Sequence, residues 1–415
     1  MGIRNTEMKH ILYVEDRPML LTQWLLNSEY IVPVLLRFQH CRDAFSEEYL
    51  KKTEHENLVF WVNIMNPIES EAQRFQRWQI SKGVRVEYFL NPSEVAQYFS
   101  QSFARYLELP CLTEEQTICS RNKARMKDKL REIGFKTANY REICNVEELI
   151  EAGHEMGWPI VLKPVDDSSC RDTFVLKSPE EAKKIYMHSK YQWLAEEYIN
   201  MMEFALDVLI FDSKAIAYYP LMYPAQLIKT LDGEINASIT MRHYSTAIKD
   251  KAEYIINKYI QGMNITHGYV HIEYFADPAH KQIVLGEVGL RLSGSQIPVI
   301  HGLSYGINLF DTLIKIHIGE YPVLDYIENR FVGELLLPVK QGKVKEISTL
   351  NELIQMEGVI DGVLIVTEGQ TVQPERASMS GSGYLLVEGQ SVDQVHQRML
   401  NILLNFKFIL ETDSK

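Results

Sequence analysis

The sequence predicts a multidomain protein that combines an α/β domain with α+β domains, and three observations support this prediction. The chain has 415 residues, which is more than one core usually serves, since single hydrophobic cores stop growing near about 250–300 residues. Short apolar runs alternate with amphipathic stretches over residues 10–109, whereas residues 192–300 show a hydrophobic period of two. We therefore expect a parallel sheet first and antiparallel sheets beyond it.

Four expected domains follow one another along the chain. The runs ILYV, YIVPVLL, NLVFWVNI and GVRVEYF predict a Rossmann-like parallel sheet within residues 1–112. That segment lacks G-x-G-x-x-G, so we expect a scaffold or substrate wall there and no dinucleotide site. A small α+β subdomain is expected at residues 113–195, a larger, mostly antiparallel one at 196–330, and a C-terminal α+β module at 331–415.

Helix signals locate several elements within these domains. The charged amphipathic residues 120–133 predict a helix that ends at Gly134. Asn145 and Ser178 are each followed three residues later by a glutamate, the spacing of a capping box, and so predict two helix starts. Hydrophobic periodicity predicts two further helices, at residues 249–261 and 303–318.

Composition narrows the class of function. The net charge of −12 argues against sequence-independent binding to nucleic acid or to anionic membranes, because both require a basic surface. The five cysteines are scattered without a C-x-x-C pair, so neither a disulfide framework nor a zinc cage is indicated. No apolar run approaches the about 18 residues of a membrane span, and no secretory signal pattern is present. We expect a cytoplasmic protein that acts on small molecules.

The stretch HGYVHIEYFADPAHKQIVLGEVGLRLSGS predicts a β-hairpin, because two alternating runs meet at an Asp-Pro turn. With a loop of three or five residues, one face is a core face formed by Val270, Ile272, Tyr274, Val284 and Val288. The other face is then formed by His271, Glu273, Leu285 and Glu287.

On that second face Glu273 and Glu287 lie across the strands, where two ionised carboxylates repel each other unless a cation lies between them. Such oxygen ligands suit Mg²⁺. Arg291 follows four residues after Glu287, and a guanidinium beside a metal site suits a phosphoryl group. The alternative is a hairpin with one solvated face, where glutamates are common.

Two lysines and three glutamates are further candidates for the site. The strand WPIVLK ends on Lys163, which requires an anion or a path to solvent, and Lys123 lies on the charged helix, where lysines are usually solvated. In WLAEEYINMMEFALDVLIF, Glu196, Glu197 and Glu203 interrupt apolar runs. The extended backbone after Glu196 offers a carbonyl and an amide to a purine edge, and Glu203 offers an acceptor to ribose hydroxyls. Solvated surface glutamates are the alternative.

Taken in order, Lys123, Lys163 with its loop, E-E-Y-I, Glu203, H-I-E and E-V-G-L-R-L-S-G-S-Q-I-P resemble the ATP-grasp superfamily over residues 113–319. The preceding α/β domain and the following module are similar to those of the carboxylate-amine ligase branch, in particular the L-amino acid ligases that join two amino acids into a dipeptide. The resemblance implies an ATP-grasp fold between these two domains, with ATP and Mg²⁺ or Mn²⁺ as cofactors.

The resemblance also implies roles for individual residues. The ATP phosphates fall to Lys123, Lys163, Arg291 and a mobile loop at residues 166–172 that includes Ser168 and Ser169. The adenine hinge falls on Glu196, Glu197 and Ile199, the ribose on Glu203, and the metal on Glu273 and Glu287. The small-residue turn near the acyl group is Ser293, Gly294 and Ser295.

Two departures from the family pattern are visible, and substrate residues are less so. The loop at residues 166–172 holds three aspartates and no glycine, and Gly289 stands where a metal-binding Asn is often found. Arg242 and His243 are candidates to hold a substrate carboxylate, and His271 and His301 are further candidates. For all four, a packing or surface role is the alternative.

The reaction expected from the resemblance activates a carboxylate. The γ-phosphoryl group of ATP moves to the carboxylate of an amino acid, and the acyl phosphate is attacked by an amine, giving ADP and phosphate. No covalent protein nucleophile is required, and Cys170 is interpreted as a small loop residue. Two alternatives stay open: loading of an amino acid onto a carrier-protein thiol, and a nucleotide-binding relative without turnover. The expected partners are amino acids, and a homodimer is left open.

Overall fold

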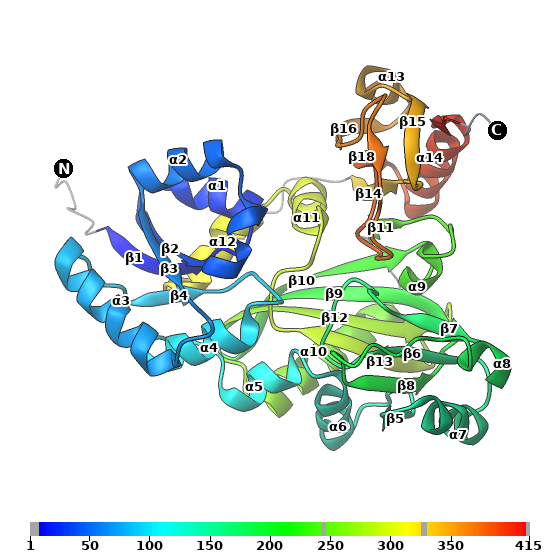
Figure 1. Cartoon of the computed structure of the whole chain (residues 1–415), viewed down its shortest axis with the longest axis horizontal. Coiled ribbons are helices and arrows are strands. Elements are labelled where there is room, and N and C mark those ends of the chain that lie inside the picture. The colour runs from blue at the N-terminus through cyan, green and yellow to red at the C-terminus, as the bar shows by residue number, and fades with distance from the viewer. Residues whose placement is uncertain (1–7, 242–245, 325–329, 412–415) are drawn as a thin grey trace. The chain divides into compact units, whose positions relative to one another are not determined.

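The computed structural model describes residues 8–241, 246–324 and 330–411, which form two compact units (Figure 1). The first unit comprises the described residues up to Arg121 together with Phe310–Pro322. The second unit comprises the rest of the described chain. Every helix in the described residues is too short or too polar to cross a lipid bilayer.

The first unit contains the predicted parallel sheet, in the order β3-β2-β1-β4. Its strands are β1 (Lys9–Val14), β2 (Ile31–Phe38), β3 (Leu58–Val62) and β4 (Tyr88–Leu90). The helical elements of this unit are α1 (Leu20–Leu26), η1 (Gln39–Ala44), α2 (Glu47–Glu56), α3 (Ile68–Lys82), α4 (Gln97–Tyr106), α5 (Glu114–Cys119) and most of α12 (Leu309–His317). The strand centres are fully buried because apolar side chains point to both faces, as expected for a parallel sheet covered by helices.

The second unit begins with a small antiparallel sheet in the order β5-β8-β6-β7. Its strands are β5 (Tyr140–Ile143), β6 (Ile160–Pro164), β7 (Phe174–Leu176) and β8 (Trp193–Glu197). The accompanying helices are α6 (Lys123–Ile133), α7 (Val146–Met156) and α8 (Pro179–Ala182). The apolar face of α7 packs against β6 and β8, which closes the core of this small sheet.

A larger sheet of eight strands follows, in the order β13-β12-β9-β10-β11-β14-β18-β16. Its strands are β9 (Met202–Phe211), β10 (Lys214–Tyr223), β11 (Ala237–Thr240), β12 (Gly268–Ala276), β13 (Ile283–Gly289), β14 (Phe331–Leu337), β16 (Val359–Leu364) and β18 (Gly383–Gly389). Figure 1 shows β10, β9, β12 and β13 side by side, in green. The C-terminal strands thus continue the same sheet.

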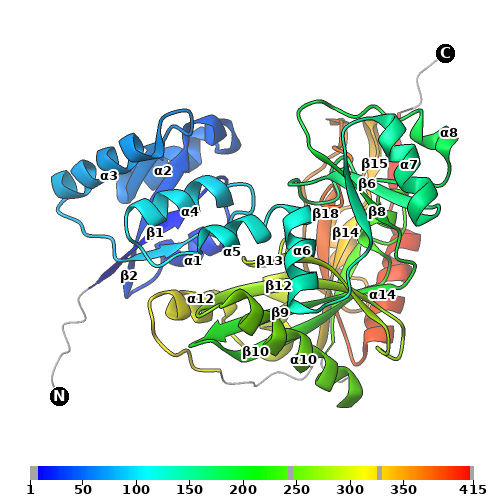
Figure 2. The same cartoon turned by 90° about the horizontal axis from the view of Figure 1, so that it is seen from below.

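The remaining elements of the second unit complete the C-terminal module and the helices near the large sheet. The helices are α9 (Leu227–Thr230), α10 (Thr246–Met263), α11 (Ile297–Tyr305), α13 (Leu350–Ile354) and α14 (Val392–Asn405). A three-stranded sheet consists of β15 (Gly342–Ile347), β17 (Thr371–Val372) and β19 (Phe408–Leu410). In Figure 2, α14 lies beside β14 and β18, and its apolar side chains are part of their core.

Helix boundaries differ from the prediction at two places. The helix predicted for residues 120–133 starts at Lys123, because the Asn122 side chain caps it by accepting from the Arg125 amide at 2.9 Å. The segment before it forms the separate helix α5, which was not predicted. The helix predicted for residues 303–318 is two helices, because Gly306 adopts a left-handed conformation with φ +69° and ends α11.

The predicted hairpin forms, but its parity was wrong on one side. Ala276 pairs with Ile283, so the loop has six residues and, without correction, would set Glu273 opposite Gly286. A β-bulge between Glu273 and Tyr274 restores the pairing of Glu273 with Glu287. Beyond the bulge, Tyr274 pairs with Leu285. The prediction placed Tyr274 and Val284 on the core face and Leu285 on the opposite face, so it was wrong for this part of the hairpin.

Candidate active site

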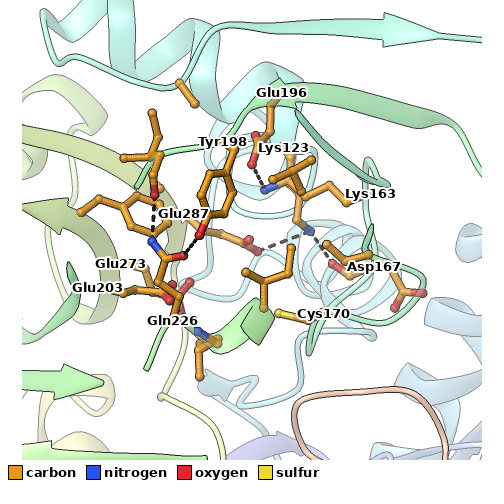
Figure 3. A pocket seen from close by; sticks show the side chains of 18 of the residues that line it. Lys123, Lys163, Asp167, Cys170, Glu196, Tyr198, Glu203, Gln226, Glu273 and Glu287 are labelled. Atoms are coloured by element: carbon orange, nitrogen blue, oxygen red, sulfur yellow. Dashed lines mark hydrogen bonds and ion pairs between the residues drawn. The ribbon is translucent and has the colours of Figure 1, made fainter. Parts of the chain in front are cut away.

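An open cleft in the second unit is lined by residues of both of its larger sheets (Figure 3). The cleft brings together many of the residues predicted from the sequence, namely Lys123, Lys163, Ser168, Ser169, Glu196, Glu197, Ile199, Glu203, Glu273 and Glu287. Segments up to 164 residues apart in the sequence, from Lys123 to Glu287, therefore meet in one site.

Other predicted residues lie apart from the lining of this cleft. Arg291, Ser293, Gly294 and Ser295 follow the end of β13, and His271 lies on β12 beneath Glu273 in the hydrogen-bond network described below. Burial raises the pKa of Tyr223 well above its ordinary value, with Glu273 adding to the rise and Arg291 opposing it. The charges of Arg291 and Glu273 therefore both influence the pKa of this buried tyrosine. Arg242 and His243 lie outside the described residues.

Glu273 and Glu287 face each other across the hairpin, as predicted. Glu273 Oε1 lies 3.1 Å from His271 Nε2, and Glu287 Oε1 lies 3.4 Å from Lys123 Nζ. Their side chains are 21% and 29% exposed, so both carboxylates reach the cleft. Within the described residues no group of three or more His, Cys, Asp or Glu side chains forms a ready metal cage. Two carboxylates are a typical protein contribution to Mg²⁺, which keeps waters and phosphate oxygens as its other ligands.

Glu196 holds two buried lysines, one of which the sequence analysis missed. Its carboxylate lies 2.6 Å from Lys163 Nζ and 3.1 Å from Lys127 Nζ. Burial alone would raise the pKa of Glu196, but Lys127 and Lys163 outweigh it and lower the pKa to about 2. Lys163 is thus already paired, and a phosphate would share it with Glu196. Lys127 follows Lys123 by one helical turn on α6, a spacing that places both on one face and could have identified it.

Lys123 joins the loop at residues 166–172 to the carboxylate pair. Its ammonium donates to the backbone oxygen of Asp167 and lies within ion-pair distance of Glu287, as Figure 3 shows. Its side chain is only 8% exposed. Lys123 was expected to be solvated, as lysines on charged helices usually are, but it is buried. The first turn of α6 packs against the chain directly before the loop, where the Lys123 amide donates to Val165 O at 2.9 Å.

Asp167 makes several hydrogen bonds that help to shape the loop at residues 166–172. Asp167 accepts hydrogen bonds from the Ser168 amide at 2.8 Å, from Arg171 Nη1 at 3.1 Å and from the Tyr191 hydroxyl at 3.1 Å. Three residues of the loop that are not glycine have left-handed backbones, namely Ser169 (φ +58°), Cys170 (φ +51°) and Asp172 (φ +49°). Each such residue costs about 1–3 kcal/mol, so the surroundings must hold the loop in place.

A buried amide organises the opposite wall of the cleft. Gln226 Nε2 donates to the backbone oxygens of Ile199 at 2.8 Å and Met201 at 2.7 Å, and its Oε1 accepts from the Tyr198 hydroxyl at 2.7 Å. Gln226 was not predicted, because it lies in a turn with no sequence signal. It fixes the extended backbone at which the adenine hinge was expected.

The two glutamates expected at the nucleoside end have defined partners. Glu197 accepts from Asn139 Nδ2 at 3.0 Å. Glu203 accepts from the Leu227 amide at 2.7 Å. Burial, together with nearby Glu273, raises the pKa of Glu203 above its ordinary value. A nearby cation or hydroxyl donors would therefore stabilise the ionised form of the Glu203 carboxylate.

A buried hydrogen-bond network positions the side chain of Glu273. Asp207 on β9 bonds His271 Nδ1 at 2.6 Å and His301 Nε2 at 2.7 Å, and both Asp207 and His301 are fully buried. Burial alone would lower the pKa of His271, but Asp207 outweighs it and, with Glu273, raises the pKa to about 10. The protonated ring donates to both carboxylates. His271 and His301 were considered above as substrate residues. In the structure they belong, with Asp207, to the network that positions Glu273. Asp207 was not predicted, although it interrupts an apolar strand.

Glu334 on β14 anchors the small-residue turn after β13. It accepts from the Ser295 hydroxyl and from the Gln296 amide at 3.1 Å, and it is 1% exposed. Ser295 has the left-handed conformation, φ +55°, whereas a Cβ added at Gly294 would meet nothing within 4 Å. The turn therefore depends on Glu334 and Ser295. No local sequence pattern points to Glu334, which lies 39 residues from Ser295.

We expect the Glu334→Gln variant to become more stable relative to the wild type as the pH rises from 5 to 8. Burial raises the pKa of Glu334 to about 7, from an ordinary value of 4.5. The folded state then binds more protons than the unfolded state between these values, so the wild type loses stability as the pH rises through this window. Glutamine does not ionise; its oxygen can accept from the Gln296 amide while its NH2 group donates to the Ser295 hydroxyl oxygen. Urea unfolding at pH 5 and pH 8 measures the difference, and a gap independent of pH would contradict this account.

The thiol in the loop is not activated. Burial, with the carboxylates Glu203 and Glu273, raises the pKa of Cys170 to about 12. A protonated thiol is a poor nucleophile. This agrees with the interpretation of Cys170 as a loop residue.

Comparisons with known proteins agree with this geometry. Residues 128–297 match the ATP-grasp domain, and residues 335–411 match the L-amino acid ligase C-terminal domain 2. The L-arginine-specific L-amino acid ligase of Bacillus subtilis is 26% identical over 275 residues, which cover 64% of this chain and 66% of the relative. The chain thus spans just under two thirds of that relative's length.

Solved structures share the fold at low sequence identity. The L-amino acid ligase from Bacillus licheniformis superimposes with a TM-score of 0.73 at 17% identity, covering 97% of this chain and 99% of the other. The biotin carboxylase domain of the 2-oxoglutarate carboxylase from Hydrogenobacter thermophilus, solved with magnesium ADP and bicarbonate, gives 0.67 at 14% identity, covering 97% and 91%.

The two matches identify an ATP-grasp domain and, after it, a C-terminal domain of the L-amino acid ligase type.

Proposed function

We propose that this protein uses ATP to activate the carboxylate of one amino acid as an acyl phosphate and joins it to the amine of a second amino acid. The observation that supports this most is the pair Glu273 and Glu287, which faces Lys123 and Lys163 in one cleft. Acidic groups that take up a divalent ion and basic groups that take up phosphate are the two requirements of phosphoryl transfer.

The donor set of the cleft fits a magnesium ion. Glu273 and Glu287 supply carboxylate oxygens at adjacent strand positions, and His271 holds Glu273 through its second nitrogen. A bound Mg²⁺ would neutralise charge on the phosphate oxygens and orient the γ-phosphoryl group. Asp207 and His301, which support Glu273 through His271, are fully buried and thus pre-organised.

The protein's own residues contribute position and charge. In the proposal, Lys123 and Lys163 contact the phosphates, and Arg291 stabilises the charge on the transferred group. The backbone at Glu197 to Ile199, fixed by Gln226, contacts the adenine. The carboxylate substrate attacks the γ-phosphorus, ADP leaves, and the amine then displaces phosphate from the acyl carbon. The amino-acid substrates of the B. subtilis relative, named for arginine, suggest a first choice of substrate.

A phosphate-release screen over all pairs of amino acids, with ATP and Mg²⁺, tests this proposal. Mass spectrometry should find a dipeptide in each productive reaction. Phosphate release only when a carrier protein is present would support thiol loading instead. Nucleotide binding without phosphate release in any reaction would show a binding protein and contradict the proposal.

Arg291→Ala should lower kcat at least about 100-fold while the chain stays folded, because the guanidinium is proposed to act on transition-state charge. Arg125→Ala on the exposed side of α6 is a matched control, since its side chain is 65% exposed. Activity of the Arg291 variant within about threefold of the wild type would remove Arg291 from the site.

A further inference from the structure

The C-terminal module reaches the phosphate loop through one short segment, residues 374–380, which we name the clasp. The clasp lies between β17 and β18 and belongs to the same compact unit as the loop. Glu375 and Arg171, which join the two, are 204 residues apart along the chain. The site described above contains no clasp residue.

Three contacts join the clasp to the centre and the C-terminal end of the loop. The Ser378 amide donates to the backbone oxygen of Ser169, the first of the left-handed residues, at 2.8 Å. Arg376 Nη1 donates to the Thr173 oxygen at 2.6 Å, where the loop returns to β7. Arg171 Nη2 donates to Glu375 Oε2 at 3.2 Å.

The clasp is itself fixed to the body of the unit. Asn236 Nδ2 donates to the Ser378 oxygen at 2.6 Å, and within the clasp Ser380 Oγ donates to the Glu375 oxygen at 2.6 Å. Ser378 is only 6% exposed. The Arg376 guanidinium also stacks over the Phe174 ring, 4.9 Å from its centroid. These contacts make the clasp a rigid support, since both its backbone and its largest side chain have partners.

We propose that the clasp positions the phosphate loop for ATP, so that Glu375, Arg376 and Ser378 are positioning residues for the reaction. This inference rests on the proposed function. Loops that cradle phosphate usually reach left-handed conformations through glycine, which adopts them without a steric penalty. This loop has no glycine, so the conformation of Ser169, Cys170 and Asp172 is held from outside. The C-terminal module therefore contributes to phosphate binding without contacting the nucleotide.

The Arg376→Ala variant tests the clasp in the full-length protein. Hydrogen exchange of backbone amides at residues 166–173 should rise at least about fivefold, because the loop opens more often when its support is lost. The affinity for ATP with Mg²⁺ should fall about tenfold, as expected for the loss of one charge-assisted hydrogen bond. The affinity for AMP, which lacks the β- and γ-phosphates, should stay unchanged, and a merely structural defect would weaken both nucleotides.

Glu375→Ala is a second variant with little risk to folding, since this side chain is 71% exposed. It should raise loop exchange in the same direction and by less. Lys407→Ala, which removes an exposed ion pair to Glu346 elsewhere in the C-terminal module, is the matched control and should change neither quantity. Unchanged loop exchange and ATP affinity in both clasp variants would overturn the inference. Absence of ligase activity would instead reject the proposed function, because exchange is measured without turnover.

Discussion

Replacing Glu287 with alanine is expected to lower turnover at least about 100-fold. The variant loses one of the two carboxylates that face each other across the hairpin, and with it the proposed metal ligand. It also removes the carboxylate that lies 3.4 Å from the Lys123 ammonium, which keeps its hydrogen bond to the Asp167 oxygen. The measurement is kcat with ATP and the productive amino-acid pair at several Mg²⁺ concentrations. The apparent Mg²⁺ requirement should rise in the Glu287→Ala variant as well.

The matched control for this experiment is Glu142→Ala, a glutamate that is exposed on strand β5. This variant should keep the wild-type kcat and the wild-type Mg²⁺ dependence. Glu287→Ala protein with a normal melting temperature and unchanged Mg²⁺ dependence would show that the carboxylate pair does not hold the metal.

Replacing Glu196 with alanine should destabilise the fold by about 3–5 kcal/mol, the usual effect of leaving buried charges without their partner. Lys127 and Lys163 have side chains only 2% and 14% exposed, and both depend on this single carboxylate. Urea unfolding at pH 7 measures the effect. The stability difference from the wild type should shrink as the pH falls from 4.5 towards about 2, because the pKa of Glu196 in the folded state is lowered to about 2.

The neighbouring Glu197 supplies the control for this second prediction. It is partly exposed and hydrogen-bonds Asn139, so Glu197→Ala should cost about 1 kcal/mol or less. ATP should partly restore the stability of the Glu196→Ala variant, since its phosphates offer the two lysines new partners. Equal stability of the two variants would mean that the lysines reach solvent on their own.

The sequence predicted the hairpin and its carboxylate pair because alternation of side chains is a local property. The opposition of Glu273 and Glu287 is observed, although the loop length on which it was based is different. The loop has an even number of residues, and the bulge adds Gly286 as an unpaired residue on β13. The two effects cancel, so Glu273 still pairs with Glu287. A Cβ at Gly286 would lie 3.3 Å from the backbone oxygen of Glu273. The bulge therefore depends on a close approach of the two backbones, which the hydrophobic periodicity does not reveal.

The partners of the predicted residues were harder to predict, because they come from distant segments. A buried strand ending in Lys163 correctly indicated the need for an anion, but Glu196 approaches from a neighbouring strand opposite Val161. Asp207 and Glu334 are similar cases, since each supports a site residue from another strand of the large sheet. Side-chain type indicates that a partner is required, and only the fold determines which residue provides it.

The eight-stranded sheet has a consequence for how this protein can be cut or recombined. β14 takes its place between β11 and β18, and Ala237 to Ile239 pair directly with Leu335 to Gly333. A chain ending before Phe331 would leave the backbone donors and acceptors of β11 open along one edge, together with the apolar side chains that α14 covers. A truncated version of this enzyme should therefore aggregate, and an exchange of C-terminal modules between relatives would succeed only where the two strands meet in the same register.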